Sequence, residues 1–313
     1  MIVNGPDVKH LPSVLSALLL CFLATCHQAT CQEVVPLYAG KVPNSKGAMP
    51  DEIVGREGGI RFVRNVSIPS MSVYLPDANQ SVGSAVIIFP GGGYYLEAFE
   101  IEGTQIAQAL AGHGVAAFVV KYRLPGDSTM SDKTIGPLQD AQRAIRIVRE
   151  RASSWGIDSN KIGIMGFSAG GHLASTAGTH FEKAFIPGGE EISLRPDFMI
   201  LVYPVISMTN NLTHMGSRNF LLGKHPSDSL ITFFSGEKNV TDHTPPTFLI
   251  HAEDDTTVDP GNSIGFFEAL RRHGVPAELV ILPRGEHGFA ARIPPEKWMQ
   301  PLLSWMTDNG WMK

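Results

Sequence analysis

A short glycine-flanked run, Gly166-Phe-Ser-Ala-Gly170, lies between an apolar stretch and a helix-like stretch. Residues 161–165 have the apolar continuity of a buried strand, and residues 171–177 have a composition that favours a helix. A strand that turns sharply into a helix lifts the side chain at the turn clear of its sheet, and flanking glycines make room for the strained backbone. The run therefore predicts that Ser168 is a nucleophile at a strand-to-helix turn.

Apolar runs alternate with helical patterns from Gly59 to the end of the chain. This alternation is typical of an α/β domain in which crossover helices join strands of a mostly parallel sheet. Buried strands are predicted at 85–89, 116–120, 161–165, 198–203, 248–251 and 278–282, helices at 102–112, 138–155 and 263–273, and a final helix containing Trp298 and Trp305. The length of 313 residues, 43% of them hydrophobic, suits one large domain at 33–313.

Two segments depart from this alternation. Two short early strands, Ile60–Val63 and Met71–Leu75, lie at its start, and we expect them to pair as a hairpin. Residues 207–244 are rich in Asn, His, Ser and Gly, a composition that favours a loop or a small cap inserted over the site.

The amino-terminal residues 1–32 have the pattern of an export leader. An apolar stretch at 11–24 follows Lys9 and His10, and its length suits a signal peptide rather than a spanning helix. We therefore expect a secreted or periplasmic protein with no integral membrane domain in the mature chain. Anchoring of a lipoprotein through Cys26 is the less favoured alternative, because Thr25 is a poor residue before the modified cysteine.

Charge and cysteine content limit the partners that we expect. The net charge of −5 and the absence of a basic stripe argue against a nucleic-acid partner. All three cysteines, at positions 21, 26 and 31, lie within the presumed leader. The folded body therefore depends on no disulfide and no cysteine metal site, and we expect neither a cofactor nor a metal.

A serine hydroxyl needs a base to remove its proton and an acid to orient that base. His287 lies between Gly285 and Gly288, after the last predicted strand. Asp255 follows the strand at 248–251. Nucleophile, acid and base thus occur in the chain order of a hydrolase triad, each after a strand. Asp254 is the alternative acid. Two competing histidines, His172 and His180, lie on the helix after Ser168, where packing or backbone bonding is the expected role.

The run Pro90-Gly-Gly-Gly93 directly follows a buried strand. Glycines there let the backbone approach a substrate closely, so the N–H groups of Gly92 and Gly93, with that of Ala169, are expected to form an oxyanion hole. A phosphate-binding loop is the rival interpretation, but no Gly-Lys-Ser/Thr follows.

Six motifs together resemble the acetyl-xylan-esterase-like and feruloyl-esterase-like branch of the α/β-hydrolases, from about residue 35 to the end. They are Pro90-Gly-Gly-Gly-Tyr94, Lys121-Tyr-Arg-Leu124, Asp140-Ala-Gln-Arg-Ala144, Trp155-Gly-Ile-Asp158, Gly166-Phe-Ser-Ala-Gly-Gly-His172 and Gly285-Glu-His-Gly-Phe289. The resemblance implies an α/β-hydrolase fold, with a mostly parallel eight-stranded sheet, helices on both faces and a small cap. It also implies an exported serine esterase acting on acylated carbohydrates or small esters. Lipase-like relatives have His where this chain has Pro90, so any hydrogen bond from that histidine is lost here.

Tyr94, Tyr95, His214 and Arg218 are candidates for the substrate pocket, because two follow the glycine loop and two lie in the predicted cap. Packing is the competing role for the tyrosines, and a solvated charge for Arg218. Two functional alternatives remain. A peptidase of the prolyl-oligopeptidase type shares the serine turn, and an inactive hydrolase fold could bind carbohydrate. Glycoside hydrolysis is not predicted, because it needs two facing carboxylates.

Overall fold

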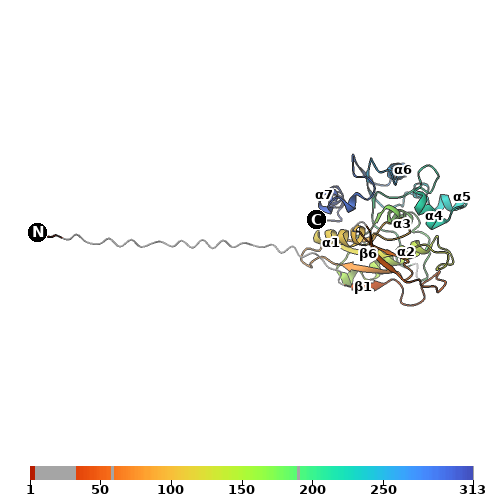
Figure 1. Cartoon of the computed structure of the whole chain (residues 1–313), viewed down its shortest axis with the longest axis horizontal. Helices are drawn as coiled ribbons and strands as arrows, with labels where there is room; N and C mark the ends of the chain where they lie inside the picture. The colour runs from red at the N-terminus through yellow and green to blue at the C-terminus, as the bar shows by residue number, and fades with distance from the viewer. Residues whose placement is uncertain (4–32, 58–59, 189–190, 313) are drawn as a thin grey trace.

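An eight-stranded sheet runs through the structure, a computed structural model that describes residues 1–3, 33–57, 60–188 and 191–312 (Figure 1). Its strands, in spatial order, are β1 (Glu33–Pro36), β4 (Ser70–Tyr74), β6 (Ala116–Lys121), β5 (Ala85–Phe89), β7 (Ile162–Phe167), β8 (Met199–Val202), β9 (Thr247–Ala252) and β10 (Ala277–Leu282). The pairs β1/β4 and β4/β6 are antiparallel and all the others are parallel. The predicted mostly parallel eight-stranded sheet is thus confirmed.

The predicted hairpin is wrong. Strand β3 (Ile60–Arg64) pairs with β2 (Ile53–Glu57) in a separate two-stranded sheet, whereas β4 lies between β1 and β6 in the main sheet. Met71 and Val73 of β4 are fully buried, and within such a core the backbone N–H and C=O groups on both edges of the strand need partners, which β1 and β6 supply. Both β1 and β2 have short sequences that mix charged and apolar residues and gave no strand pattern.

Helices cover both faces of the main sheet, and each face has its own apolar core. On one side lie α1 (Gln105–Gly112), α7 (Pro295–Trp298) and α8 (Gln300–Asp308), packed through residues such as Ile106 and Leu302. On the other side lie α2 (Gly136–Glu150), α3 (Ser168–Thr179) and α6 (Gly261–Arg272), packed through residues such as Leu138 and Phe266. A π-helical turn, η1 (Glu100–Thr104), leads into α1, and the 3₁₀ turns η2 (Ala152–Trp155) and η4 (Phe289–Ala291) complete the body.

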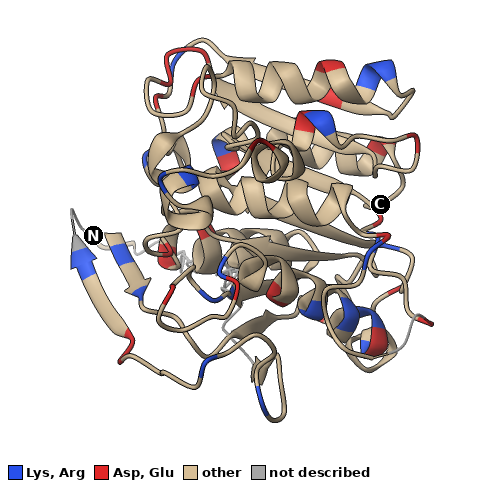
Figure 2. Ribbon diagram, turned by 90° about the vertical axis from the view of Figure 1, so that its right-hand side faces the viewer, with Lys and Arg blue, Asp and Glu red and all other residues tan. Residues whose placement is uncertain are grey.

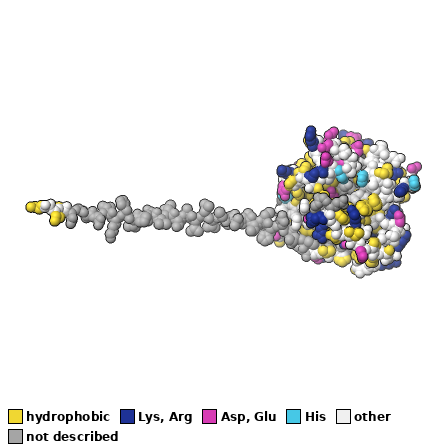
Figure 3. Space-filling view, in the orientation of Figure 1, with side chains coloured by type: hydrophobic (Ala, Val, Ile, Leu, Met, Phe, Trp, Pro, Cys, Tyr) yellow, Lys and Arg dark blue, Asp and Glu magenta, His cyan; other side chains and the backbone are white. Residues whose placement is uncertain are grey.

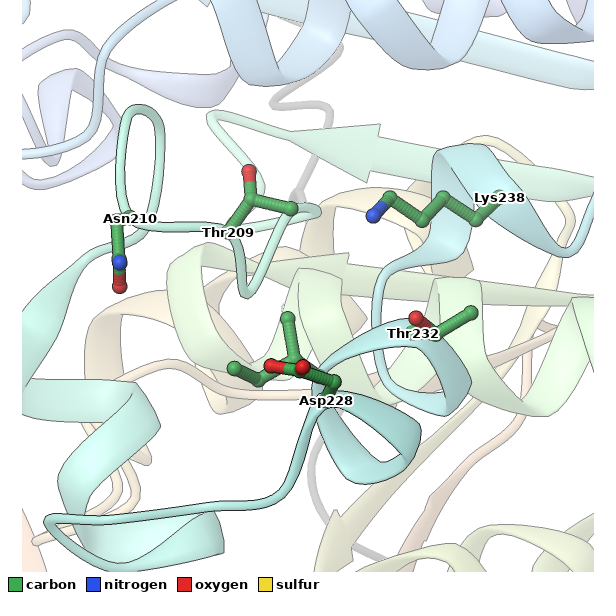
Figure 4. A pocket seen from close by; sticks show the side chains of 6 residues that line it. Thr209, Asn210, Asp228, Thr232 and Lys238 are labelled. Carbon is green, nitrogen blue, oxygen red and sulfur yellow. The ribbon is translucent and has the colours of Figure 1, made fainter.

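Residues 207–244 lie between β8 and β9 and contain α4 (Met215–Leu222), α5 (Asp228–Phe233) and the 3₁₀ turn η3 (Gly236–Lys238). Figure 1 shows α4 and α5 beside one another at the edge of the molecule. This segment holds a cavity of about 250 Å³, into which the Lys238 side chain points toward Thr209 (Figure 4). None of the residues lining the cavity belongs to the predicted triad.

Charges of both signs are interspersed over the surface. Segments of Lys and Arg and segments of Asp and Glu are scattered over the ribbon in Figure 2, and hydrophobic and charged side chains intermingle on the face in Figure 3. Among the residues that the structure describes, no helix is long and apolar enough to cross a membrane. The predicted leader at 1–32 lies almost entirely outside the described residues.

Candidate active site

Ser168 lies at the turn between β7 and α3, as the glycine-flanked run predicts. Its φ angle of 51° falls in the left-handed region that non-glycine residues rarely adopt. Glycines surround it for steric reasons, since a Cβ at Gly166 would lie 2.1 Å from the Gly170 carbonyl oxygen. A Cβ at Gly170 would lie 2.1 Å from the carbonyl oxygen of Phe89 on β5. The turn therefore needs glycine at both positions.

Ser168, His287 and Asp255 form a continuous hydrogen-bonded chain. The Ser168 hydroxyl lies 2.9 Å from His287 Nε2, and His287 Nδ1 lies 2.7 Å from Asp255 Oδ2. The three residues follow β7, β10 and β9, whose carboxyl ends meet at one edge of the sheet. Geometry thus brings together the three residues that chain order predicts.

Asp255 is buried, yet hydrogen bonds keep it ionised. Its Oδ1 accepts bonds of 2.9 Å from the N–H groups of Thr257 and Val258, and its Oδ2 accepts one of 3.1 Å from His251 Nε2. Burial raises the pKa of the Asp255 carboxyl, but the bonds from His251, His287 and Val258 outweigh it and hold that pKa well below its usual range. Asp255 therefore carries the negative charge that a protonated His287 needs.

Sequence reasoning missed His251, which contacts Asp255. It is fully buried on β9, its Nδ1 accepts a 2.8 Å bond from the Ser263 hydroxyl, and its Nε2–H is shared between Asp255 and the Val258 carbonyl oxygen. The available signal was a histidine ending an otherwise apolar strand four residues before Asp255.

Asp254, the alternative acid, has a different set of partners. Its Oδ1 accepts the N–H groups of Gly285 and Glu286, at 2.8 and 2.7 Å. These residues immediately precede His287 in the chain. Asp254 therefore braces the loop that carries the histidine, whereas Asp255 contacts the imidazole itself.

The loop at residues 90–93 presents its backbone beside the serine. Gly92 and Gly93 have φ angles of 128° and 65°, and a Cβ at Gly92 would lie 2.1 Å from the Leu96 carbonyl oxygen. Among the described residues, neither glycine donates its N–H to a protein acceptor. The Ala169 N–H lies at the start of α3, where amides have no intrahelical acceptor. Among the residues that the structure describes, the three predicted donors therefore have no protein acceptor for their N–H groups.

The N–H of Gly91, by contrast, already has an acceptor. It donates to Glu102 Oε2 over 2.7 Å, and Glu102 Oε1 accepts a 2.9 Å bond from the Tyr203 hydroxyl. Sequence reasoning identified neither Glu102 nor Tyr203. A carboxylate in an amphipathic helical pattern gives no sign of being buried under a loop.

Tyr94 differs from its predicted role. Its side chain is 1% exposed, and its hydroxyl donates a 2.8 Å hydrogen bond to His172 Nδ1. His172 in turn donates from Nε2 to the Phe234 carbonyl oxygen over 2.7 Å. Tyr94 and His172 therefore join the glycine loop to α3 and the cap, and the Tyr94 ring has no face open to a ligand.

Tyr95 is accessible, with 49% of its surface exposed. Its ring stacks on that of Phe220 from α4, with centroids 5.2 Å apart, and the Arg64 guanidinium carbon lies 4.5 Å from its centroid. Phe220 is itself 41% exposed. The two rings therefore form an aromatic surface between the glycine loop and the cap.

The two cap candidates differ in their position. Arg218 is buried, and its Nη1 bonds to Asn210 Oδ1 within the cap. His214 caps the start of α4, because its Nδ1 accepts a 3.3 Å bond from the Ser217 N–H, and its Cε1 lies 3.8 Å from where a Gly93 Cβ would be. Burial lowers the pKa of His214, and the nearby His287 lowers it further. Thus His214 borders the catalytic groups, whereas Arg218 supports the cap.

His172 makes the free energy of unfolding depend on pH. Burial lowers its pKa to about 4, whereas an unfolded histidine titrates at about 6.5. Because the unfolded chain binds the proton first, the stabilisation is complete above about pH 6.5 and falls by about 3 kcal/mol as the pH drops to about 4. We expect His172→Gln to remove this component of the pH dependence, measured as the free energy of urea unfolding between pH 7 and pH 4. Replacement of the exposed His113 by Gln is the control, and an unchanged slope in His172→Gln would contradict the assignment.

The sequence matches the BD-FAE family over residues 71–270. It is 41% identical over 225 residues to endo-1,4-beta-xylanase B of Butyrivibrio fibrisolvens, covering 71% of this chain and 35% of that protein. It is also 41% identical over 223 residues to an acetylxylan esterase of Xylanibacter ruminicola, covering 70% and 43% of the two chains. The chain therefore spans less than half the length of these two relatives.

Solved structures show the same fold. A crystal structure of an acetyl ester-xyloside bifunctional hydrolase from Caldicellulosiruptor lactoaceticus has a TM-score of 0.78 and 35% identity, covering 92% of this chain and all of that one. The carboxylesterase Cest-2923 of Lactobacillus plantarum, at 22% identity, has a TM-score of 0.64 over 84% of this chain and 98% of its own. With the family match, the predicted resemblance is confirmed: the chain belongs to the BD-FAE family and is an acetylxylan-esterase-like α/β-hydrolase.

Proposed function

We propose that this protein is a serine carboxylic ester hydrolase that removes acetyl, or other short or aryl acyl, groups from sugars or small esters. The observation that carries the proposal is the hydrogen-bonded chain from Ser168 through His287 to Asp255, together with the N–H groups of Gly92 and Gly93, which donate to no acceptor in the described part of the chain. The family membership supports the same chemistry.

The proposed reaction proceeds through an acyl-enzyme. His287 Nε2 takes the Ser168 proton as the serine oxygen bonds to the ester carbonyl carbon, and Asp255 stabilises the resulting imidazolium. The N–H groups of Gly92, Gly93 and Ala169 hold the oxyanion. The alcohol then leaves with the proton from His287. A water molecule, deprotonated by His287, attacks the acyl carbonyl, and the carboxylic acid and free serine are released.

Fluorophosphonate labelling combined with a substrate panel tests this function. We expect covalent labelling at Ser168, turnover of p-nitrophenyl acetate and acetylated xylan, and no cleavage of peptide amides. Cleavage of amides in preference to esters would favour the prolyl-oligopeptidase type of peptidase. A folded protein that neither labels nor turns over esters would favour the inactive carbohydrate-binding module. Feruloyl and other aryl esters in the same panel report the acyl preference.

We further propose that the alcohol side of the substrate is a carbohydrate that contacts Tyr95. Aromatic rings offer a rigid, partly apolar surface next to a polar tip, and Tyr95 with Phe220 presents such a surface beside the glycine loop. The buried Tyr94 and Arg218 are proposed to support the pocket wall from behind.

We expect Tyr95→Ala to raise KM for an acetylated xylo-oligosaccharide about tenfold, which corresponds to the loss of roughly 1.4 kcal/mol of contact. The kcat/KM for methyl acetate should stay within about twofold, because its one-carbon alcohol offers no ring to pack on Tyr95. Ile264→Ala, at an exposed apolar residue on α6, is the control. Equal losses on both substrates would show that Tyr95 supports the loop rather than the carbohydrate.

Export is also proposed, from the apolar stretch at 11–24 that follows Lys9 and His10. The mature protein is then secreted or periplasmic. Mass spectrometry of the protein from its native host tests this, and a mature chain that retains residues 1–32 would refute it.

A further inference from the structure

Glu102 is a buried carboxyl group that the acyl-enzyme reaction above does not use. Its side chain is 6% exposed, and each of its oxygens has a hydrogen-bond donor from a different segment. Oε2 accepts the Gly91 N–H at 2.7 Å and Oε1 accepts the Tyr203 hydroxyl at 2.9 Å. Burying a carboxyl group costs free energy unless such bonds compensate, so a position of this kind requires a reason.

The turn that carries Glu102 is unusual in itself. It lies in the π-helical turn η1, a rare conformation that often occurs at functional sites. Gly103 lets this turn lie directly on β6, because a Cβ there would lie 2.6 Å from Val119 Cγ1. The turn thus holds Glu102 rigidly against the sheet.

Residues 98–102 form hydrogen bonds with both the N–H and the carbonyl group of Gly91. Glu102 accepts the Gly91 N–H, and the Ala98 N–H donates to the Gly91 carbonyl oxygen over 2.9 Å. Gly91 also lies against the nucleophile, since a Cβ there would be 2.9 Å from Ser168 Cβ and 2.7 Å from the Phe167 carbonyl oxygen. Gly91 therefore sets the distance between the serine and the next two residues, Gly92 and Gly93.

Tyr203 connects Glu102 to the histidine. It follows β8 with a φ angle of 36°, a strained value for a tyrosine. Its ring packs edge-to-face against His287, with centroids 5.1 Å apart and an interplanar angle of 63°. The Glu102 carboxyl group thus connects the glycine loop at residues 90–93 to Tyr203, the residue that packs against His287.

We propose that Glu102 is a positioning residue for this reaction: by holding Gly91 and Tyr203 together, it fixes the Gly92 and Gly93 amides and the His287 ring relative to Ser168. The inference rests on the proposed esterase function. Its effect is on the placement of transition-state donors rather than on substrate binding, so its loss should lower kcat and leave KM nearly unchanged.

Kinetics of p-nitrophenyl acetate hydrolysis by the full folded chain test the proposal. We expect Glu102→Ala to lower kcat about 100-fold, near the effect of losing one oxyanion donor, with KM within about threefold. Glu102→Gln should restore kcat to within about fivefold of the wild type, because its amide can accept from Gly91 and donate to Tyr203. Tyr203→Phe, which leaves the Gly91 bond intact, should cost about tenfold in kcat. Glu100→Ala, in the same turn but paired with Arg56 at the surface, is the control and should change kcat less than twofold.

A second readout separates positioning from general destabilisation. An arylboronic acid forms a tetrahedral adduct with the serine, and its affinity should fall about as much as kcat in each variant while thermal unfolding shows that the chain is folded. If Glu102→Ala fails to fold, Tyr203→Phe and Glu102→Gln decide. A kcat within threefold of the wild type in Tyr203→Phe, or a Glu102→Gln as impaired as the alanine variant, would overturn the proposal. A wild type without ester turnover would instead refute the esterase function on which it rests.

Discussion

Replacement of Ser168 by alanine is expected to lower kcat for p-nitrophenyl acetate by about 10⁵-fold or more, because the acyl-enzyme can no longer form. The remaining rate should be that of the oxyanion donors acting on bound ester and water. A methyl side chain fits the same turn, so the free energy of unfolding should change by less than about 1 kcal/mol. Initial-rate assays at high enzyme concentration and urea unfolding measure the two quantities.

Ser175→Ala is the matched control for this variant. Ser175 is a buried serine on the same helix, and its hydroxyl donates to the His172 carbonyl oxygen over 3.0 Å. Its loss should leave ester turnover and fluorophosphonate labelling unchanged. Turnover that survives in Ser168→Ala but disappears in a different serine variant would move the nucleophile elsewhere.

The second large effect is expected at Asp255, where substitution by asparagine should lower kcat about 10⁴-fold. The amide removes the charge that stabilises the His287 imidazolium, and it allows the wrong tautomer to face Ser168. The neighbouring Asp254→Asn is the matched control. Both bonds to Asp254 end on Oδ1, which an asparagine retains, so its kcat should stay within about threefold. The reverse ranking would assign the acid role to Asp254.

The central strands could be predicted because consecutive residues in them are apolar and buried. Ala85–Phe89 and Ile162–Phe167 are buried at every position, and this produces an unbroken apolar run in the sequence. The strand at the edge of the sheet had no comparable apolar run in its sequence. Strand β1 alternates half-buried and exposed residues over only four positions, so its pairing with β4 depends on the assembled sheet.

Within the candidate site, the predictable part is the part that local sequence encodes. The serine turn, the glycine loop and the order of Asp255 and His287 are each visible in a few adjacent residues. Glu102 is different, because its partner Tyr203 lies 101 residues away along the chain. Whether a glutamate in a helical pattern faces solvent or a backbone amide depends on which loop the fold places over it. The sequence could not decide between packing and substrate contact for Tyr94 for the same reason, since its burial depends on His172 and the cap.

The aromatic stack of Tyr95 and Phe220 joins side chains from two different parts of the fold. Phe220 comes from a helix inserted between β8 and β9, whereas the triad residues stand on turns that follow the sheet strands. Where Tyr95 contacts the carbohydrate as proposed, exchange of side chains on α4 changes that contact without a change in any residue that holds Ser168, Asp255 or His287. Libraries directed at α4 are thus the place to select new alcohol preferences while the chemical step is kept constant.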